Sequence, residues 1–406
     1  MAKEYVPNQK IIQKYAELLV KFALNSGKGV QPGEVVQCNV PDVAKPLALA
    51  LQNVILQCGA HPMIRLMPTG FDRDFYQNAN DDQLTFFPSP FLKARTELID
   101  HNISIIADVF PNDLKDVPPE KIMKALSSKG EYINWLDKKE NQGKFTWTIG
   151  LWGTQAKADE VGLTLKEYWA QIIDACYLDK KDPVKEWTDI HNSQEFIKKT
   201  LNDMEIQWLH VQGEDADLHI QLGSDRIWNG GSGRNIPSFE IFTSPNWRGT
   251  HGWIRFNQPL YRYGQVIKNV RLELVDGLVT KAEATVGQTL LSEMLKTVNA
   301  NKLGEYSLTD RRMSRITHVM AETLFDENIS GPFGNTHLAI GRSYHDCFRG
   351  NPAEIEAEEW AERGFNHSAE HTDIISTTDR TVTATLKSGE KKVIYQDGQF
   401  TFYDGK

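Results

Sequence analysis

The sequence has few cysteines and no long apolar run. Its four cysteines, among 406 residues, are widely scattered and form no Cys-x-x-Cys pair. This pattern is typical of reduced thiols in a cytoplasmic protein and argues against a disulfide framework or a zinc ribbon. The longest apolar stretches, such as Ile103–Val109, fall far short of the roughly 18 residues that a membrane span needs. Residues 1–5 contain no apolar segment or cleavage site, so we expect no secretory signal and no membrane partner.

Positive charge is also in short supply. The chain has 45 lysine and arginine residues against 54 aspartate and glutamate residues, which gives a formal net charge of -9. This balance argues against nucleic acid or an anionic membrane surface as the main partner. Hydrophobic residues make up 40% and charged residues 24% of the chain, as in ordinary globular proteins. The length fits two domains at about 100–200 residues each.

Several well-known catalytic signatures are missing from the sequence. No Gly-x-Gly-x-x-Gly follows the first expected strand, and no Gly-Lys-Ser/Thr follows the glycine-rich segment 229–233, so we do not expect a nucleotide phosphate loop. We expect that segment to be a turn that brings backbone close to a site. The absence of Gly-x-Ser-x-Gly and His-Glu-x-x-His argues against a protein nucleophile and excludes a helical zinc site of that kind.

The first 150 residues alternate between helix and strand patterns. Apolar residues at three-to-four spacing over 11–22 predict an amphipathic helix, and Pro41-Asp42 offers an N-cap for a second one. The alternation predicts an open, mostly parallel sheet of the α/β class within a chain that is α+β overall. The expected strands are 34–40, 62–67, 103–109 and 145–151, and the expected helices are 11–22, 43–58 and 118–126.

The pattern changes near residue 205. Residues 164–204 are helical in pattern with a break at Asp182-Pro183, whereas short strands are expected at 206–211 and 216–221. Two hairpins follow, with Asp276-Gly277 and Ser388-Gly389 at their turns; Asp-Gly is typical of a type I′ turn. We therefore predict an N-terminal α/β domain over 1–205 and a β-rich, metal-binding catalytic domain over 206–406.

Candidate metal ligands gather in the second half of the chain. His371 and Asp373 would point to the same face of a strand, and an imidazole beside a carboxylate suits a first-row dication. The competing interpretation is a surface loop with an incidental His-x-Asp. Glu240 lies inside an apolar stretch, and Glu305 follows an expected helix over 290–299. A buried carboxylate must be paired, hydrogen-bonded or metal-bound.

Three further residues are ambiguous when taken singly. His337 precedes the apolar run Leu338–Ile340, which suggests a buried strand with the imidazole at its entrance. A lone histidine there is more often a satisfied core residue than a ligand. Glu327 belongs to an Asp-Glu-Asn triplet, and Tyr344 would by itself be interpreted as packing.

Taken in order, these segments resemble the aminopeptidase T / aminopeptidase S family of metallo-aminopeptidases. The resemblance is strong across 235–373 and extends to the opening helix. Five motifs in the right order are much more specific than any one of them. They are Asn-Ile-Pro-Ser-x-Glu-Ile-Phe-Thr-Ser-Pro, Gly-Glu, Asp-Glu-Asn, Thr-His-Leu-Ala-Ile-Gly and Asn-x-Ser-x-x-His-x-Asp.

The resemblance implies a dinuclear metal site. The positions that match the family's metal ligands are Glu240, Glu305, Glu327, His337, His371 and Asp373, and Tyr344 matches its active-site tyrosine. The chain departs from the family pattern twice. Phe239 stands where the family has a first glutamate, which leaves Glu240 as the glutamate ligand there, and an insertion at about 331–335 suggests a reshaped pocket rim.

The implied activity is hydrolysis of the N-terminal residue from short peptides with a free amine. Four carboxylates and two imidazoles would neutralise two divalent ions, which could be zinc, cobalt, manganese or magnesium. We hypothesise that Glu305 or Asp373 bridges the ions, that Glu305 accepts the proton of the attacking water, and that Tyr344 donates to the oxyanion. The family also implies a homodimer.

Two other interpretations compete with this one. The chain could be a non-catalytic binding protein that keeps the fold, if Phe239 or the insertion dismantles a metal position. It could also be a metal-dependent hydrolase of another amide. Convergence of the six ligands distinguishes the first alternative, and substrate profiling distinguishes the second.

Overall fold

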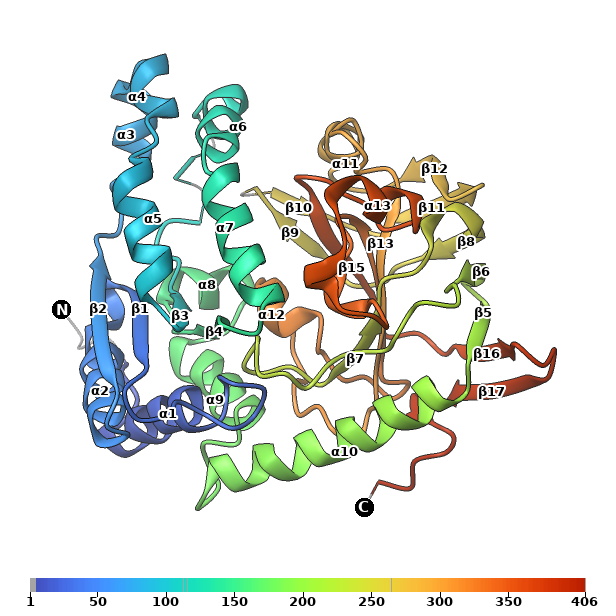
Figure 1. Cartoon of the computed structure of the whole chain (residues 1–406), viewed down its shortest axis with the longest axis horizontal. Coiled ribbons are helices and arrows are strands. Elements are labelled where there is room, and N and C mark those ends of the chain that lie inside the picture. The colour runs from blue at the N-terminus through green and yellow to red at the C-terminus, as the bar shows by residue number, and fades with distance from the viewer. Residues whose placement is uncertain (1–4, 112, 115, 264, 406) are drawn as a thin grey trace. The chain divides into compact units, whose positions relative to one another are not determined.

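The computed structural model describes residues 5–405 except 112, 115 and 264 (Figure 1). The chain divides into two compact units, one of residues 1–188 with 232–237 and the other of residues 189–231 with 238–406. The chain passes from the first unit to the second within helix α10 (Pro183–Asp203). The domain boundary at 205/206 stays a prediction.

The first unit is built on a four-stranded sheet in the order β2-β1-β3-β4, and all its pairs are parallel. This confirms the predicted open parallel sheet with helices. The strands are β1 (Val35–Pro41), β2 (His61–Met67), β3 (His101–Ile106) and β4 (Thr146–Leu151), and the main helices are α1 (Gln9–Lys21), α2 (Lys45–Gln57), α6 (Pro119–Ser127), α8 (Gln155–Glu160) and α9 (Leu165–Ala175).

Helix α1 shows how the sequence specifies these elements. Asn8 caps it by accepting the backbone N–H of Ile11 at 3.1 Å. Its predicted apolar face is buried. Tyr15 on that face accepts a hydrogen bond from the backbone N–H of Leu151 at 2.8 Å, which ties the helix to β4.

One local expectation for this unit was wrong, and several helices were not predicted. Asp42 does not cap α2, because a 3-10 turn (Asp42–Ala44) intervenes and Ala44 holds the cap position. Asp42 Oδ1 instead accepts from the hydroxyl of Thr69 at 2.8 Å. The sequence patterns also missed α3 (Asp72–Asn78), α4 (Asp81–Thr85), α5 (Ser89–Leu98) and α7 (Gly130–Asn141).

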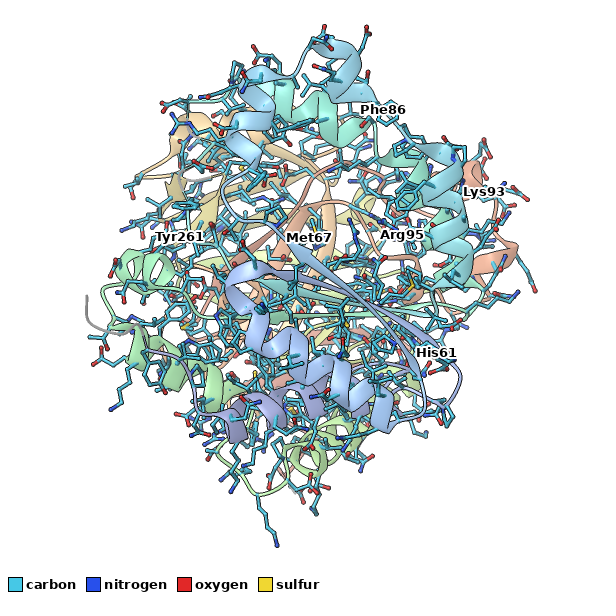
Figure 2. The ribbon with its side chains drawn as sticks, turned by 90° about the vertical axis from the view of Figure 1, so that its left-hand side faces the viewer. His61, Met67, Phe86, Lys93, Arg95 and Tyr261 are labelled. Atoms are coloured by element: carbon cyan, nitrogen blue, oxygen red, sulfur yellow. The ribbon has the colours of Figure 1, made fainter. Side chains whose placement is uncertain are left out.

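Three of the missed helices bury few or no described side chains. Neither α3 nor α7 buries a described side chain, and α5 buries only Thr96 among its described residues. Apolar side chains nearby face solvent instead: Met67 at the end of β2 is 41% exposed and Phe86 after α4 is 73% exposed (Figure 2). The apolar residues of this segment therefore do not mark a buried helix face.

The second unit is β-rich, as predicted, and its named strand pairs are antiparallel. Its largest sheet has eight strands in the order β12-β11-β8-β6-β5-β16-β17-β18, and a four-stranded sheet has the order β15-β14-β13-β7. The eight strands are β5 (Ile206–Gly213), β6 (Ala216–Gln221), β8 (His251–Arg255), β11 (Arg271–Val275), β12 (Leu278–Glu283), β16 (Thr381–Leu386), β17 (Lys391–Gln396) and β18 (Gln399–Phe400).

The two hairpin predictions had different outcomes. Asp276 and Gly277 both have positive φ, 49° and 77°, which confirms the type I′ turn between β11 and β12. The β16–β17 hairpin also exists, but residues 387–390 connect its strands. Its turn is therefore a four-residue connection rather than a second two-residue turn.

No helix among the described residues is long and apolar enough to cross a membrane. All four cysteines are free thiols, and three of them are buried.

Candidate metal centre

The four-stranded sheet of the second unit carries the predicted ligands on one face. Its strands are β7 (Glu240–Thr243), β13 (Leu303–Thr309), β14 (Asn335–Gly341) and β15 (His371–Ser376). In register, Ser307 lies opposite His337 and Ala339 opposite Asp373. Because side chains alternate along a strand, Glu305 and His337 share a face with Asp373. The opposite face carries apolar side chains such as Leu308 and Ile340, which are fully buried.

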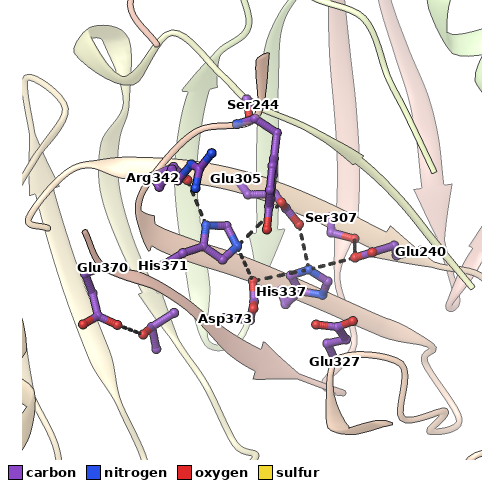
Figure 3. Close-up of polar contacts among 12 residues, drawn as sticks. Glu240, Ser244, Glu305, Ser307, Glu327, His337, Arg342, Glu370, His371 and Asp373 are labelled. Carbon is purple, nitrogen blue, oxygen red and sulfur yellow. Dashed lines mark hydrogen bonds and ion pairs between the residues drawn. The ribbon is translucent and has the colours of Figure 1, made fainter. Parts of the chain in front are cut away.

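His337 lies among three carboxylates. Its Nε2 is 3.1 Å from Glu305 Oε1, 3.3 Å from Glu240 Oε2 and 3.9 Å from Asp373 Oδ1 (Figure 3). Glu240, Glu305 and His337 each offer a ligand atom within 4.8 Å of the others, and all three residues are buried. The sequence expectation that His337 lies in a buried strand is confirmed, although it is the third residue of β14.

His371 and Asp373 complete this side of the group. The strand is formed as expected, and His371 Nε2 is 3.4 Å from Asp373 Oδ1 and 3.9 Å from Glu305 Oε2. The other ring nitrogen, Nδ1, is 2.8 Å from the carbonyl of Arg342. A donor bond to that carbonyl orients the ring and points Nε2 at the carboxylates.

Glu327 reaches the same group from outside the sheet. It follows helix α12 (Thr323–Asp326), and Figure 3 shows its carboxylate on the side of His337. Asp326 next to it has a structural role, because its Oδ1 accepts from the backbone N–H of Met320 at 2.6 Å. The structure therefore brings all six predicted positions together, and we call them the six-residue cluster: Glu240, Glu305, Glu327, His337, His371 and Asp373.

The predicted tyrosine lies beside this cluster. The ring of Tyr344 meets that of His371 edge-on, with centroids 4.9 Å apart. Burial raises the pKa of Tyr344 well above its usual range, and the charges of Glu305 and Asp373 raise it further. The phenol is therefore neutral at physiological pH and able to donate a hydrogen bond.

The two departures from the family pattern have defined places in this unit. Phe239 is fully buried, and its backbone N–H donates to Asn328 Oδ1 at 2.7 Å. In the insertion, Gly334 comes so close to Tyr395 that an added Cβ would lie 2.1 Å from the phenol oxygen. Tyr395 also donates to the carbonyl of Thr309 at 2.8 Å, so the insertion packs against the end of β13.

The cluster has strongly shifted protonation equilibria. Burial raises the pKa of Glu305 to about 7, against the hydrogen bond from His337, and the Glu240 and Asp373 charges add to the rise. Burial also raises the pKa of Glu327, and the neighbouring carboxylates reinforce the effect.

The pKa values of His371 and Asp373 shift in opposite directions, each toward the charged form. Burial lowers the pKa of His371, but the Asp373 charge and hydrogen bond outweigh it and bring the pKa to about 9. The pKa of Asp373 falls to about 2 because His371, together with other neighbouring positive groups, overcomes the opposing effect of burial.

The donor set fits divalent cations. Four buried carboxylates face two imidazoles, so with the carboxylates ionised even two protonated histidines would leave the group with a net negative charge. One Nε2–H of His337 cannot bond three carboxylates at once, whereas a shared cation would engage all of these atoms. Ligands about 2.1 Å from one ion lie about 3.0–3.4 Å apart, close to the 3.1 and 3.3 Å separations around His337.

The sequence analysis missed the supports of these ligands. Ser307 and Ser238 place their hydroxyls 3.4 Å and 3.3 Å from the two oxygens of Glu240. Strand alternation was the available signal for Ser307, because it lies two residues after Glu305. The glycine-rich turn was correctly expected to approach a site: an added Cβ on Gly230 would lie 2.3 Å from the carbonyl of Glu240.

The chain is similar in sequence to proteins named aminopeptidases. The chain is 27% identical over 416 residues to aminopeptidase 2 of Geobacillus stearothermophilus, covering 97% of this chain and 98% of that protein. It is 29% identical over 310 residues to aminopeptidase T of Thermus aquaticus, covering 71% of this chain and 74% of that protein. It is also 26% identical to aminopeptidase AmpS of Bacillus subtilis, covering 96% of this chain and 98% of that protein.

A solved structure shares the fold. Wild-type AmpT from Thermus thermophilus superposes with a TM-score of 0.83 at 22% sequence identity, covering 97% of this chain and 99% of that one. The family model described as thermophilic metalloprotease (M29) matches residues 8–400. With nearly the whole chain matched, this protein belongs to the thermophilic metalloprotease family M29.

Proposed function

We propose that this protein is a metal-dependent aminopeptidase that removes the N-terminal residue from short peptides. The observation that carries the proposal is the convergence of the six-residue cluster on one face of a buried sheet. Membership of a metalloprotease family supports it, as do relatives named aminopeptidases.

The proposed ligands of two divalent ions are the members of the six-residue cluster. Such ions would supply Lewis acidity toward the peptide carbonyl and favour a nucleophilic water at neutral pH. The oxygen-rich donor set implies a loose metal preference, so zinc, cobalt, manganese or magnesium could serve. We also propose that the enzyme is a homodimer.

Glu305 is the proposed general base. Its carboxylate lies on the central strand β13, next to two other carboxylates and both imidazoles. Its carboxylate would accept a proton from the attacking water and return it to the leaving amine. Either Glu305 or Asp373 would serve as the bridging carboxylate.

Tyr344 is the proposed donor to the oxyanion. Its phenol stays neutral because burial and the nearby carboxylates oppose ionisation. The backbone N–H of Tyr344 donates to Ser244 Oγ at 2.8 Å, and its ring packs against His371. A phenol held in this way is preorganised for a developing negative charge.

The first experiment is metal reconstitution. Protein stripped with a chelator is titrated with cobalt, zinc, manganese or magnesium and tested on a panel of aminoacyl chromophores. We expect activity to return as two equivalents bind and to vanish when the substrate amine is acetylated. Glu305→Gln should lose about 10²–10⁴-fold in kcat, whereas Glu293→Gln, at a side chain 59% exposed, should match the wild type.

The alternatives give different results in the same assay. If metal binds to the six-residue cluster but no aminoacyl substrate is hydrolysed, the protein acts on another amide or another molecule. If no metal binds there, the ligand assignment is wrong and a non-catalytic binding role takes its place.

A further inference from the structure

Three histidines form a row across adjacent strands of the eight-stranded sheet, a different sheet from the one whose strands carry most of the six-residue cluster. His210 on β5 lies directly opposite His219 on β6, and His219 lies opposite His251 on β8. The rings of His210 and His219 stack with centroids 3.9 Å apart, and those of His219 and His251 at 4.9 Å. We call these residues the histidine row. None of the motifs that led to the proposed function includes any of them.

A carboxylate stands beside the row. Asp217 lies two residues before His219 on β6, so both point to the same face of the sheet. Asp217 Oδ1 is 2.7 Å from His210 Nε2 and 4.0 Å from His219 Nε2. Each of these three residues offers one ligand atom, and the three atoms lie within 4.8 Å of one another.

The site faces solvent. The side chains of His210, His219 and Asp217 are 28%, 39% and 60% exposed, whereas the alternate residues Leu209 and Leu218 are completely buried. An ion from solution can therefore reach the three donors without any opening of the core.

The geometry points to a binding site for one divalent transition-metal ion, with His210, Asp217 and His219 as its ligands. Neither ring nitrogen of His219 has a hydrogen-bond partner among the residues that the structure describes. The Nε2 atom of His219 is therefore available without the loss of a hydrogen bond. Ligands about 2.1 Å from one ion lie about 3.0–3.4 Å apart. To complete the site, the His210–Asp217 pair would spread from 2.7 Å, and the stacked rings of His210 and His219 would tilt so that their Nε2 atoms face one point.

The ring of His219 is held close to the other two donors by stacking. It lies between the rings of His210 and His251, at interplanar angles of 15° and 7°. His251 is itself anchored, because its Nδ1 is 3.0 Å from the carbonyl of Gly249. Burial and the positive charge of its neighbours lower the pKa of His219, against the effect of Asp217, which favours the neutral imidazole that binds metals.

The donor chemistry selects the class of ion. Two imidazoles and one carboxylate suit zinc, copper, nickel or cobalt, whereas magnesium and calcium require more oxygen ligands. Three protein ligands leave at least one coordination position for water or for a group from another molecule. Because the donors come from two hydrogen-bonded strands, a bound ion would link β5 to β6.

The test is a count of bound zinc by equilibrium dialysis of chelator-stripped, full-length protein, read by elemental analysis. We expect His210→Ala and His219→Ala each to bind one zinc fewer per chain than the wild type. Asp217→Asn, which keeps the side-chain shape, should weaken binding of that ion at least about tenfold, because even a substitution outside the ligand shell typically costs that much. The exposed His61 on β2 provides the matched control, and His61→Ala should bind as much zinc as the wild type.

The outcomes separate this site from the six-residue cluster. Substitutions in the histidine row should leave metal-reconstituted aminopeptidase activity unchanged, so failure of the proposed function would not alter the zinc count attributed to His210 and His219. If all three variants bind zinc with the stoichiometry and affinity of the wild type, the assignment is wrong. Equal losses in His61→Ala would show adventitious surface binding and would also overturn it. Far-ultraviolet circular dichroism of each variant verifies that it is folded.

Discussion

At the scale of single residues, several side chains of the six-residue cluster are oriented by hydrogen bonds from residues around them. The Arg342 carbonyl orients His371, and the hydroxyls of Ser238 and Ser307 contact Glu240. Such supports fix the rotamer of a ligand before an ion binds, which lowers the reorganisation that binding requires. None of these contacts follows from residue type alone.

Replacing Tyr344 with Phe tests the oxyanion role at this scale. The ring contact with His371 needs only the aromatic ring, so Tyr344→Phe should fold and bind metal like the wild type. Removal of the donor should reduce kcat by about 10²–10³-fold with little change in KM. Steady-state kinetics on an aminoacyl chromophore measures this, and a variant with unchanged kcat would remove Tyr344 from the mechanism.

At the scale of elements, strand β7 is placed by the glycine-rich turn before it. Asn229 and Phe242 exchange backbone hydrogen bonds of 2.7 and 2.9 Å, and Gly230 has φ 135° where it passes the carbonyl of Glu240. A residue with a side chain rarely adopts this φ, and an added Cβ would collide with the carbonyl of Glu240. The turn therefore sets the position of Glu240.

Gly230→Ala should destabilise the protein and disturb the cluster together. Strain and the close contact with Glu240 should cost about 1–3 kcal/mol of unfolding free energy and weaken metal binding. The control is Gly389→Ala, which has φ 87° but no atom within 4 Å of an added Cβ. Urea denaturation and metal titration should show stability loss in both variants but weaker metal binding only in Gly230→Ala. Wild-type metal affinity in Gly230→Ala would contradict this role of the turn.

At the scale of the whole molecule, the cluster couples metal binding, pH and folding. The Glu305 pKa of about 7 exceeds its unfolded value of about 4.3, so the native state binds more protons and loses stability as pH rises between these values. The His371 pKa of about 9 gives stability that is complete below about 6.5 and lost as pH rises toward 9. Asp373, with its pKa near 2, acts in the opposite sense: its contribution is present above about 3.9 and is lost as pH falls below that.

Metal-stripped protein should therefore become less stable from pH 5 to pH 9. A bound divalent ion stabilises the ionised carboxylates and neutral imidazoles, so the metal-loaded protein should show a smaller decline. Urea midpoints at pH 5, 7 and 9, with and without metal, measure both curves. The difference in pH dependence between stripped and loaded protein should be smaller in Glu305→Gln, because glutamine cannot ionise. Parallel curves for stripped and loaded wild type would contradict the coupling.

The local chemistry of the sequence predicted a large part of this molecule. A run of apolar residues predicted β3, and the Asp276-Gly277 pair predicted the β11–β12 hairpin. Glu240 stood out because it is a carboxylate within an apolar run. These signals depend on neighbours along the chain. The sequence patterns missed helices α3 and α7, and neither of them buries a described side chain.

The order of the motifs along the chain determined the family, and strand periodicity determined which residues of each strand share a face. The meeting of Glu240, Glu305, His337 and Asp373 was decided only by the register of four antiparallel strands, whose partners are far apart in sequence. The histidine row has the same origin, because His210, His219 and His251 become neighbours only through strand pairing. Local sequence fixes which face a side chain takes, but long-range hydrogen bonding decides which side chains meet on it.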